Sequence, residues 1–288
     1  MNGGAAAREG LLERRVEIRA LKTQEELKAC VALQRETWGD DYHDVVPASI
    51  LQIAQKVGGV VAGAFNENEL VGFVFGLTGT RRGRLVHWSH MLAVKDRLRD
   101  QGIGRYLKEF QRDRLREQGV GVMHWTFDPL VARNAYLNLK RLGVEVEEYV
   151  CEMYGDTGSA LHRFGTDRFV VGWETSRRPG GRLAEEQKWQ DAPVLNGLKD
   201  GRRVPDGGPV RIQIPSDIEA VYADSPAEAM RWRRTTRDAF EQCFEQAYGV
   251  AGFQREKVSG RCFYLLERGV DGAGKVVQYV SRGSGGKA

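Results

Sequence analysis

A glycine-containing loop between an apolar stretch and a helix is the segment of this chain with the clearest chemistry. The apolar stretch ends in Trp88-Ser-His-Met-Leu-Ala-Val94, and Arg99-Asp-Gln-Gly102-Ile-Gly104 follows five residues later. A helix that begins in such a loop exposes unpaired backbone N–H groups and the positive end of its dipole, which together bind a diphosphate. The glycines let the backbone approach the ligand closely, because a side chain would block it. The alternative is an ordinary turn.

The composition argues against several other kinds of chemistry. The net charge of +4 is small beside 43 Lys and Arg and 39 Asp and Glu residues, and the charges are spread along the chain. We therefore do not expect nucleic-acid binding. Four cysteines stand far apart without a C-x-x-C pair, which predicts neither a disulfide framework nor a zinc site. We expect no metal and a reducing environment.

No segment is expected to contact a membrane. The N-terminus lacks the apolar core of a signal peptide, and no run of 18 or more apolar residues occurs in the chain. The predicted location is therefore cytoplasmic.

The elements that must position the glycine loop form a mixed α/β series. Periodicity and turn residues predict strands at 16–21, 60–65, 70–77, 84–94, 120–126, 144–154 and 168–173. Helices are predicted from Thr23 to about Thr37, from Pro47 to Gly58, from the glycine loop to Gly119 and, around Ala135, Leu139 and Leu142, to Gly143. Since a helix joins strands 84–94 and 120–126, we expect those two strands to be parallel.

The pattern changes after residue 177. Pro and Gly clusters with few periodic apolar residues predict a linker at 178–208, followed by a smaller C-terminal α/β unit at 209–268. In this unit we expect a strand at 210–214, a helix from Pro226 to Tyr248 and a strand at 263–266. The two ends of the chain, at 1–14 and 269–288, are predicted to be flexible.

The order of elements and the motif Arg99-x-x-Gly102-x-Gly104 together resemble the GNAT superfamily of acyl-CoA N-acyltransferases. The resemblance covers about residues 15–177 and implies an α/β (α+β) fold with a mixed central sheet flanked by helices. Trp88 to Val94, Trp125 to Leu130, Arg133 to Asn138 and Thr166 to Phe169 resemble more narrowly a poorly characterised bacterial branch of predicted GNAT acyltransferases. That branch also carries an extra C-terminal region.

The resemblance implies coenzyme A as the co-substrate, in the form of acetyl-CoA or another acyl-CoA. Its pyrophosphate would bind backbone amides of Gln101, Gly102, Ile103, Gly104 and Arg105, and Arg99 or Arg105 would add a charged contact. The pantetheine arm would pair with the strand backbone at Leu92, Ala93 and Val94, where the fourth and fifth strands splay apart. Asn134 and Asn138, four residues apart on one helical face, are expected to contact the coenzyme arm.

His90 is the predicted general base. The reaction implied by the resemblance needs an amine to lose a proton, attack the thioester carbonyl and release a thiolate. His90 is expected on one strand face with Trp88 and Leu92, and an imidazole with an ordinary pKa of about 6.5 suits that proton transfer. The backbone N–H near Leu92 is the expected oxyanion donor. A hydrogen-bonded core histidine is the alternative for His90.

The acid that protonates the thiolate has several candidates in the sequence. GNAT proteins often place a tyrosine four residues before the glycine that closes the helix after the fifth strand, with an asparagine seven residues earlier. Counting back from Gly143, those positions hold Leu139 and Ala132. Asn138, Tyr136 and Tyr149 are candidate replacements, and a thiol with a pKa of about 8.5 leaves with little help.

Three residues are candidates for binding the acceptor. Trp38 lies where acceptor-binding loops fall in the GNAT fold, and its alternative is an anchoring aromatic in a solvated loop. Asp128 either binds substrate or turns the chain before Pro129. Arg168 either clamps a carboxylate of the acceptor or pairs with a neighbouring element.

Two further motifs are interpreted as structural. Gly269-Val-Asp-Gly-Ala-Gly-Lys275 nearly matches a P-loop, but Val276 replaces the magnesium-binding Ser or Thr, so we expect a hairpin turn before a strand. The basic segment from Arg231 to Arg237 is expected to be a helix with solvated arginines and a buried Trp232.

The predicted function is acyl transfer from acetyl-CoA, or from a larger acyl-CoA such as succinyl-CoA, to a small amine or amino acid by direct attack in a ternary complex. The alternative is a non-catalytic acyl-CoA-binding module whose C-terminal unit binds a partner. A third reading, nucleic-acid binding, predicts salt-dependent retention of DNA or RNA. A homodimer is compatible with the sequence.

Overall fold

The computed structural model describes residues 16–40, 42–155, 162–180, 186–196, 207–268 and 278–280. Contacts along the chain separate two units. The first unit contains the residues up to Trp125 together with Glu174–Arg178. The second contains Thr126–Trp173 and the residues from Pro179 onward. The division therefore passes through two strands, and the boundaries of the predicted 15–177 domain stay a prediction. No helix in the described ranges has both the length and the apolar character needed to cross a membrane.

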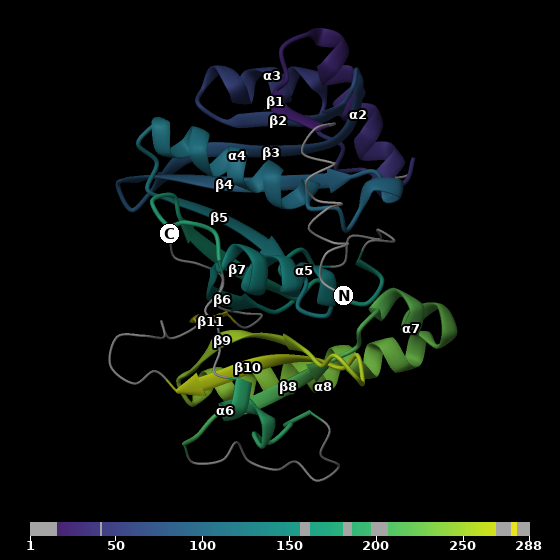
Figure 1. Ribbon diagram of the computed structural model, residues 1–288, viewed down its shortest axis with the longest axis vertical. Helices are drawn as coiled ribbons and strands as arrows, with labels where there is room; N and C mark the ends of the chain where they lie inside the picture. The colour runs from purple at the N-terminus through teal and green to yellow at the C-terminus, as the bar shows by residue number, and fades with distance from the viewer. Residues whose placement is uncertain are drawn as a thin grey trace. The chain divides into compact units, whose positions relative to one another are not determined.

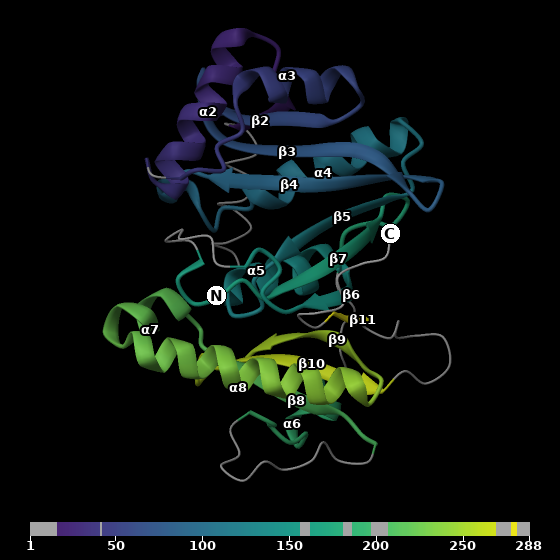
Figure 2. The same cartoon turned by 180° about the vertical axis from the view of Figure 1, so that it is seen from behind.

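The first unit is a mixed sheet covered by helices on both faces. Its strands lie in the order β1 (Val16–Ala20), β2 (Val60–Asn66), β3 (Glu69–Arg81), β4 (Arg84–Val94) and β5 (Val122–Phe127). Neighbours from β1 to β4 are antiparallel and β5 joins β4 in parallel, as predicted. Helices α2 (Gln24–Trp38) and α3 (Ala48–Lys56) lie on one face, and α4 (Ile103–Glu117) lies on the other (Figures 1 and 2). A short 3-10 turn, η1 (Asp96–Leu98), connects β4 to the glycine loop.

Helix α2 begins where its sequence predicts. Thr23 and Glu26 form a capping box in which the Thr23 hydroxyl accepts from the Glu26 N–H and the Glu26 carboxylate accepts from the Thr23 N–H. Arg19 donates to the same carboxylate and lowers the pKa of Glu26 to about 2. The N-terminus of α2 is thus filled by its own side chains. Pro47, expected as the first helical residue of α3, is instead its N-cap.

A buried polar layer joins β4 to α4 in the first unit. The Thr78 hydroxyl donates to Gly58 O, so His87 Nδ1 donates to Thr78 Oγ1 and His87 Nε2 accepts from the Gln111 amide. His87 is fully buried, and this burial lowers its pKa to about 3. The imidazole is therefore neutral at pH 7. Gly76 makes room for it, because a Cβ there would lie 2.6 Å from Trp88 O and closer still to His87 Nε2.

The second unit contains two groups of strands. In the first, β6 (Glu145–Val150) pairs antiparallel with β7 (Arg168–Glu174) and parallel with β11 (Gln278–Val280). The second group has the order β8 (Val210–Ile214), β10 (Cys262–Arg268) and β9 (Tyr248–Arg255). The helical segments of this unit are α5 (Ala132–Ala135), η2 (Tyr136–Leu142), α6 (Glu186–Gln190), α7 (Ile218–Asp224) and α8 (Pro226–Glu245).

One aromatic core ties the C-terminal residues to β6 and β7. Phe169 of β7 meets Phe240 of α8 at a ring separation of 4.9 Å, and Phe240 meets Tyr264 of β10 at 5.2 Å. Tyr149 of β6 packs 5.5 Å from Phe240. Aromatic pairs at these separations add to the free energy of burial. The second unit is therefore not built from the C-terminal residues alone.

The C-terminal region differs from its prediction in several places. The segment predicted as a linker contains α6, whose Trp189 is 2% exposed and packs with Phe263 and Leu265. The predicted long helix ends at Glu245, and the residues from Tyr248 onward form β9, which the sequence reading missed together with α7. Gln278–Val280 form β11, the strand expected after the P-loop-like segment, although 269–288 as a whole are predicted to be flexible. The P-loop-like Gly269–Lys275 and residues 1–14 lie outside the described residues.

Replacing Gly76 with alanine should destabilise the first unit. The added methyl group overlaps the Trp88 carbonyl and the His87 ring, and overpacking of this kind costs about 1–3 kcal/mol. Gly79→Ala, on the same strand with no atom within 4 Å of the new Cβ, is the control. Urea unfolding of both variants measures the difference; equal unfolding free energies would show that Trp88 and His87 move aside at no cost.

Candidate active site

The glycine loop begins α4 as predicted. Gly102 is the N-cap with φ +85°, and Asp100 also adopts a positive φ of +60°. These are left-handed conformations, which glycine adopts without the cost that side chains bring. Gly102 is therefore needed for the turn itself, beyond the close backbone approach predicted from the sequence.

The N-terminus of α4 lacks the groups that fill the N-terminus of α2. Gly102 has no side chain to cap the first turn, and no acidic residue lies in that turn. The first N–H groups of a helix have no partner within it, and its dipole places partial positive charge there. Because α4 supplies no anion of its own, its first turn suits an external one such as a diphosphate.

Both basic side chains predicted for the diphosphate already have acidic partners. Arg99 Nη2 lies 2.5 Å from Asp96 Oδ1, and Arg99 Nε donates to Val94 O at 3.3 Å. Arg105 Nε donates to Glu109 at 2.7 Å. The backbone amides of the loop are thus better placed than these guanidinium groups to receive a diphosphate.

The ladder between β4 and β5 is short. It pairs Val86 with Val122, His87 with Met123 and Trp88 with His124, and no further pair between these strands occurs in the described residues. On its other side β4 stays paired with β3 as far as Val94. The predicted segment Leu92, Ala93 and Val94 therefore lies on strand backbone that has lost its β5 neighbour. Such an edge can pair with an extended ligand.

A β-bulge interrupts β4 at His90. Phe75 opposes Met91 and Gly76 opposes Ser89, so His90 has no partner in the β3 ladder. Bulges of this kind change the direction of the side chains that follow. Met91 and Ala93 join the core cluster under α2 and α3, whereas Val94 lies with Leu107 of α4.

The bulge corrects one expectation about His90. A regular strand would place His90, Trp88 and Leu92 on one face, but the register shift moves Leu92 to the α4 face. His90 instead contacts Phe75, with the rings 6.0 Å apart and nearly perpendicular. Its side chain remains open to solvent. Partial desolvation lowers the pKa of His90 below its ordinary value, against the opposing effect of Asp44.

Trp38 ends α2 and anchors the loop that follows. Its ring lies 6.0 Å from Phe73 in an edge-on contact and 5.2 Å from Tyr42. The half-buried ring packs against the core under α2 and α3. These contacts favour the anchoring interpretation, while a role in acceptor binding stays a prediction.

Asn134 and Asn138 lie in the second unit on a helix that changes type. The segment is α-helical from Ala132 to Ala135 and a π-helix from Tyr136 to Leu142. The α-helical period that placed the two asparagines on one face therefore does not hold throughout. Asn138 is buried and Asn134 is half-buried. A π-helical turn often occurs at functional sites, but contact with coenzyme A stays a prediction for both residues.

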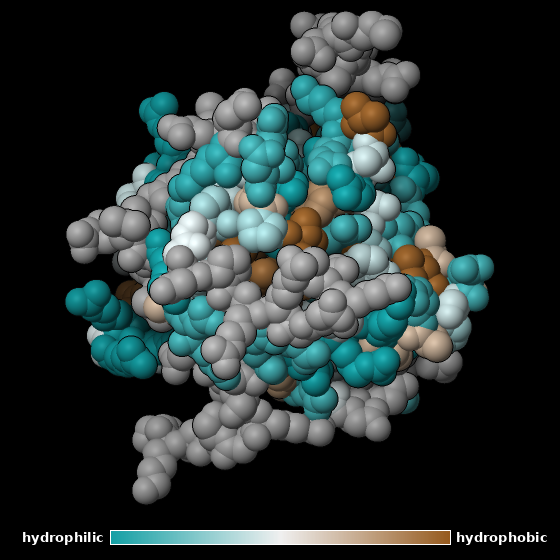
Figure 3. Space-filling model, turned by 90° about the horizontal axis from the view of Figure 1, so that it is seen from below, coloured by the Kyte–Doolittle hydropathy of each residue, from teal (hydrophilic) through white to brown (hydrophobic). Residues whose placement is uncertain are grey.

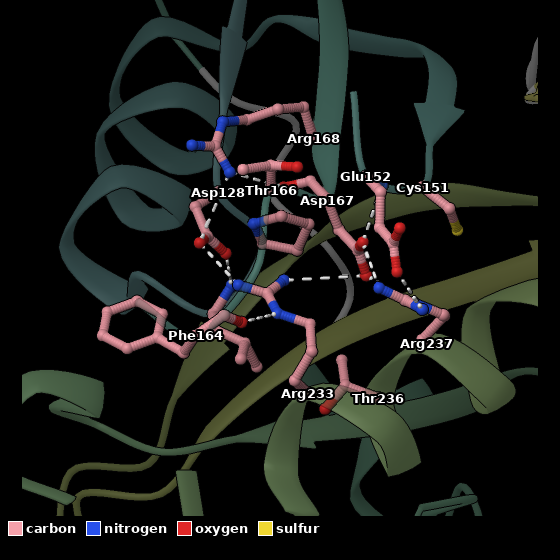
Figure 4. Close-up of polar contacts among 12 residues, drawn as sticks. Asp128, Cys151, Glu152, Phe164, Thr166, Asp167, Arg168, Arg233, Thr236 and Arg237 are labelled. Carbon is pink, nitrogen blue, oxygen red and sulfur yellow. Dashed lines mark hydrogen bonds and ion pairs between the residues drawn. The ribbon is translucent and has the colours of Figure 1, made fainter. Parts of the chain in front are cut away.

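Asp128 belongs to a buried ion network, drawn in Figure 4. Its Oδ1 accepts from the Leu130 N–H at 2.8 Å, as expected for a residue that turns the chain, and its Oδ2 accepts from Arg233 at 2.6 Å. Asp167 accepts two hydrogen bonds from Arg237, at 2.6 and 2.9 Å. Arg233 lies between the two carboxylates. Burial disfavours the charge of Arg233, yet Asp128 and Asp167 raise its pKa above the ordinary value.

Arg168 is the least compensated cation of this network. Its Nη1 donates to Asp167 O at 2.9 Å and lies 3.6 Å from Asp128, the carboxylate already bound by Arg233. Burial lowers the pKa of the Arg168 guanidinium, in contrast to that of Arg233. Its Nε and Nη2 make no hydrogen bond to the described residues. Arg168 thus keeps donors that can bind a further anion.

The burial of Arg233 and Lys108 and the partial burial of Arg237 were not predicted from the sequence. The Arg231–Arg237 segment was expected to expose its arginines and bury Trp232, but Arg233 is 3% exposed and Trp232 is half-buried. The four-residue spacing of Arg233 and Arg237, which puts both on one helical face, was the available signal. Lys108 is buried on α4, and the polar composition of that helix gives no sign of its burial.

Comparison with known proteins identifies the region that carries the glycine loop. The Acetyltransferase (GNAT) family matches residues 26–143. Residues 26–143 belong to the GNAT family. This GNAT region runs from α2 through the glycine loop to the glycine that closes η2, and it contains β4 with its bulge.

Solved structures of GNAT proteins resemble the chain at low sequence identity. The ribosomal-protein-S18-alanine N-acetyltransferase from Escherichia coli is 17% identical, with 59% of this chain and 97% of that chain covered and a TM-score of 0.42. An aminoglycoside 6'-acetyltransferase type Ii is 17% identical, covering 57% and 99%, with a TM-score of 0.45. An aminoglycoside 6'-N-acetyltransferase complexed with coenzyme A is 15% identical, covering 57% and 99%, with a TM-score of 0.43. None of the curated proteins matches the chain.

The GNAT region fits a coenzyme A ligand by its own chemistry. The N-terminus of α4 is free of side-chain caps and acids, and the β4 backbone beyond Trp88 has no β5 partner. Diphosphate and pantetheine amides need those two kinds of backbone group. Within the described ranges, no three His, Cys, Asp or Glu side chains are grouped to hold a metal ion.

Proposed function

We propose that this protein is an acyl-CoA-dependent N-acyltransferase. The observation that carries the proposal is the uncapped first turn of α4 joined through the glycine loop to a strand whose edge is open, inside a GNAT region. The loop amides from Gln101 to Arg105 would bind the diphosphate, and the backbone of Leu92, Ala93 and Val94 would pair with the pantetheine arm. The acyl group transferred is acetyl or a larger group such as succinyl.

His90 would act as the base in this reaction. Its position at the bulge leaves the imidazole open to solvent, and its lowered pKa keeps it unprotonated at neutral pH. The amine nitrogen forms a bond to the thioester carbonyl carbon, the carbon–sulfur bond breaks, and His90 takes the proton from the amine. The backbone N–H near Leu92 would donate to the carbonyl oxygen as it gains charge.

The tyrosine that GNAT proteins often use as the acid would have no counterpart at the expected position. The position expected for tyrosine holds Leu139, which is 7% exposed. Tyr149 donates its hydroxyl to Asp167 inside the core of the second unit, which argues against the alternative that it protonates the sulfur. We keep Asn138 as the candidate that assists the leaving group, and a thiol with a pKa of about 8.5 needs little assistance.

Gly102→Ala should weaken coenzyme A binding while Gly119→Ala does not. Both glycines have positive φ, +85° at the start of α4 and +75° just after its end, so the backbone cost of each alanine is similar. Only Gly102 lies in the proposed diphosphate site, where we expect Kd for coenzyme A to rise about 10-fold, the effect of losing one charge-assisted contact. Isothermal titration calorimetry measures both constants. An equal loss of affinity for coenzyme A in the two variants would show that the diphosphate does not bind at this loop.

His90→Gln should abolish the rise of kcat/KM with pH that the wild type shows on the acidic side of its pH profile. A base must be unprotonated, so kcat/KM of the wild type should rise with pH through an apparent pKa below 6.5. The variant should lose that rise and about 100-fold in kcat. Thiol release from acetyl-CoA with a panel of amines is the assay, and His43→Gln, an exposed histidine of the same unit, is the control.

The same assay distinguishes the enzyme from a non-catalytic module. Coenzyme A binding without thiol release on any amine would favour an acyl-CoA-binding module whose C-terminal region binds a partner. On the face drawn in Figure 3, the described residues are mostly hydrophilic and the hydrophobic ones form small separate groups.

The acceptor would be a small amine that carries a carboxylate, as an amino acid does. The support for this class is Arg168, whose Nε and Nη2 donors make no hydrogen bond to the described residues and whose charge the network does not fully offset. A guanidinium with two such donors matches a carboxylate bidentately. Trp38 and Asp128 stay candidates for acceptor contact, although both already make structural contacts.

An amino acid should therefore be a better substrate than its carboxamide. Loss of a bidentate charge pair corresponds to about 10-fold or more in kcat/KM, which steady-state assays of the matched substrates measure. Arg168→Lys should reduce this preference because lysine lacks the planar pair of donors, whereas Arg231→Lys on the exposed face of α8 should leave it intact. No preference in the wild type would contradict the proposed acceptor class.

A further inference from the structure

Lys108 is a buried lysine in the middle of α4. Its side chain points into the sheet of the first unit and is 4% exposed. Nζ donates to Ser89 Oγ at 2.7 Å and lies 3.8 Å from the centre of the Trp125 ring. No carboxylate lies within ion-pairing distance of Nζ among the described residues.

This burial is unfavourable for the fold. An ammonium group loses its hydration when it is buried, and one hydroxyl with one aromatic face replaces only part of that hydration. Accordingly, burial lowers the pKa of Lys108 well below the ordinary value of lysine. An apolar side chain of the same length would avoid the penalty altogether. A residue that breaks a local rule in this way points to a functional demand at its position.

The two partners of Lys108 show what that demand is. The β4–β5 ladder ends at the pair Trp88 and His124. Ser89 is the next residue on β4 and Trp125 is the next on β5, so Nζ contacts both strands at the first position beyond the ladder. Ser89 also directly precedes the bulged residue His90.

We propose that Lys108 is a positioning residue that holds β4 and β5 apart where their ladder ends. Its amine contacts Ser89 on one strand and Trp125 on the other, and so fixes the two strands at the first position beyond their ladder. The edge of β4 from Ser89 onward is thereby kept available for the extended arm of an acyl-CoA. This inference rests on the proposed acyl-CoA function and deepens it by naming the residue that maintains the binding edge.

Lys108→Met tests the inference because it separates stability from binding. Methionine keeps the length of the side chain and removes the amine, so the melting temperature should stay the same or rise by a few degrees. Kd for coenzyme A should nevertheless rise about 10-fold and KM for acetyl-CoA should rise with it, while kcat changes less. Lys28→Met, an exposed lysine of α2, is the control for the loss of a charge.

A second pair of variants covers the case in which Lys108→Met does not fold. Ser89→Ala removes the hydroxyl that binds Nζ and should raise Kd in the same direction, whereas Ser89→Thr keeps the hydroxyl and should restore binding toward the wild-type value. Unchanged affinity in folded Lys108→Met, or in Ser89→Ala, would overturn the positioning role. Wild-type protein that does not bind coenzyme A at all would instead overturn the proposed function itself.

Discussion

The early end of the β4–β5 ladder is the constraint on which the first unit depends. Backbone N–H and C=O groups need partners, and a strand that loses its neighbour inside a sheet leaves a row of them unsatisfied. Here the loss begins after Trp88, directly before the bulge at His90, and a few residues before the uncapped start of α4. A strand edge without its β5 neighbour, a bulged residue and a helix start without a side-chain cap thus follow one another along a short stretch of the described chain. Their order is that of an extended ligand ending in a diphosphate.

Charge compensation is the corresponding constraint in the second unit. Asp128 and Asp167 are buried carboxylates, and without a cation each would be costly to hold in that environment. Their partners both come from α8: Arg233 follows Asp128 by 105 residues in the chain, and Arg237 follows Asp167 by 70. Removing one partner of such a network leaves an uncompensated buried charge. That destabilises the fold far more than replacing the whole pair with apolar residues. The C-terminal residues are therefore part of the structure that folds around β6 and β7.

Local signals were read correctly from the sequence, and long-range ones were not. The bounds of β4 at Arg84 and Val94, the capped start of α2 and the parallel pairing of β4 with β5 follow from periodicity, caps and connection rules that act within a few residues. The bulge at His90 depends on register with β3, which no pattern within β4 reveals. The π-helical turn after Ala135 likewise has no signature in an otherwise regular apolar stripe.

The buried charges escaped prediction for a similar reason. Arg233 and Lys108 occupy helices whose composition is strongly polar, and a charged residue on such a helix is ordinarily solvated. Only the position of the helix relative to its sheet decides that these two face inward. Conversely, Trp189 was assigned to a linker because its surroundings lack periodicity, although it packs beneath Phe263.

Helix α4 carries two of these features at a fixed spacing. It begins at the glycine loop, and Lys108 follows Ile103 by five residues, which corresponds to about 7.5 Å along the helix axis. A helix does not stretch, so the distance from the phosphate end to the opening between the strands is set before any ligand arrives. The helix therefore fixes the length of ligand that fits. Ligands that share the diphosphate and arm of coenzyme A would reach the opening whatever acyl group they carry. A ligand with a diphosphate on a shorter arm would not extend as far as His90.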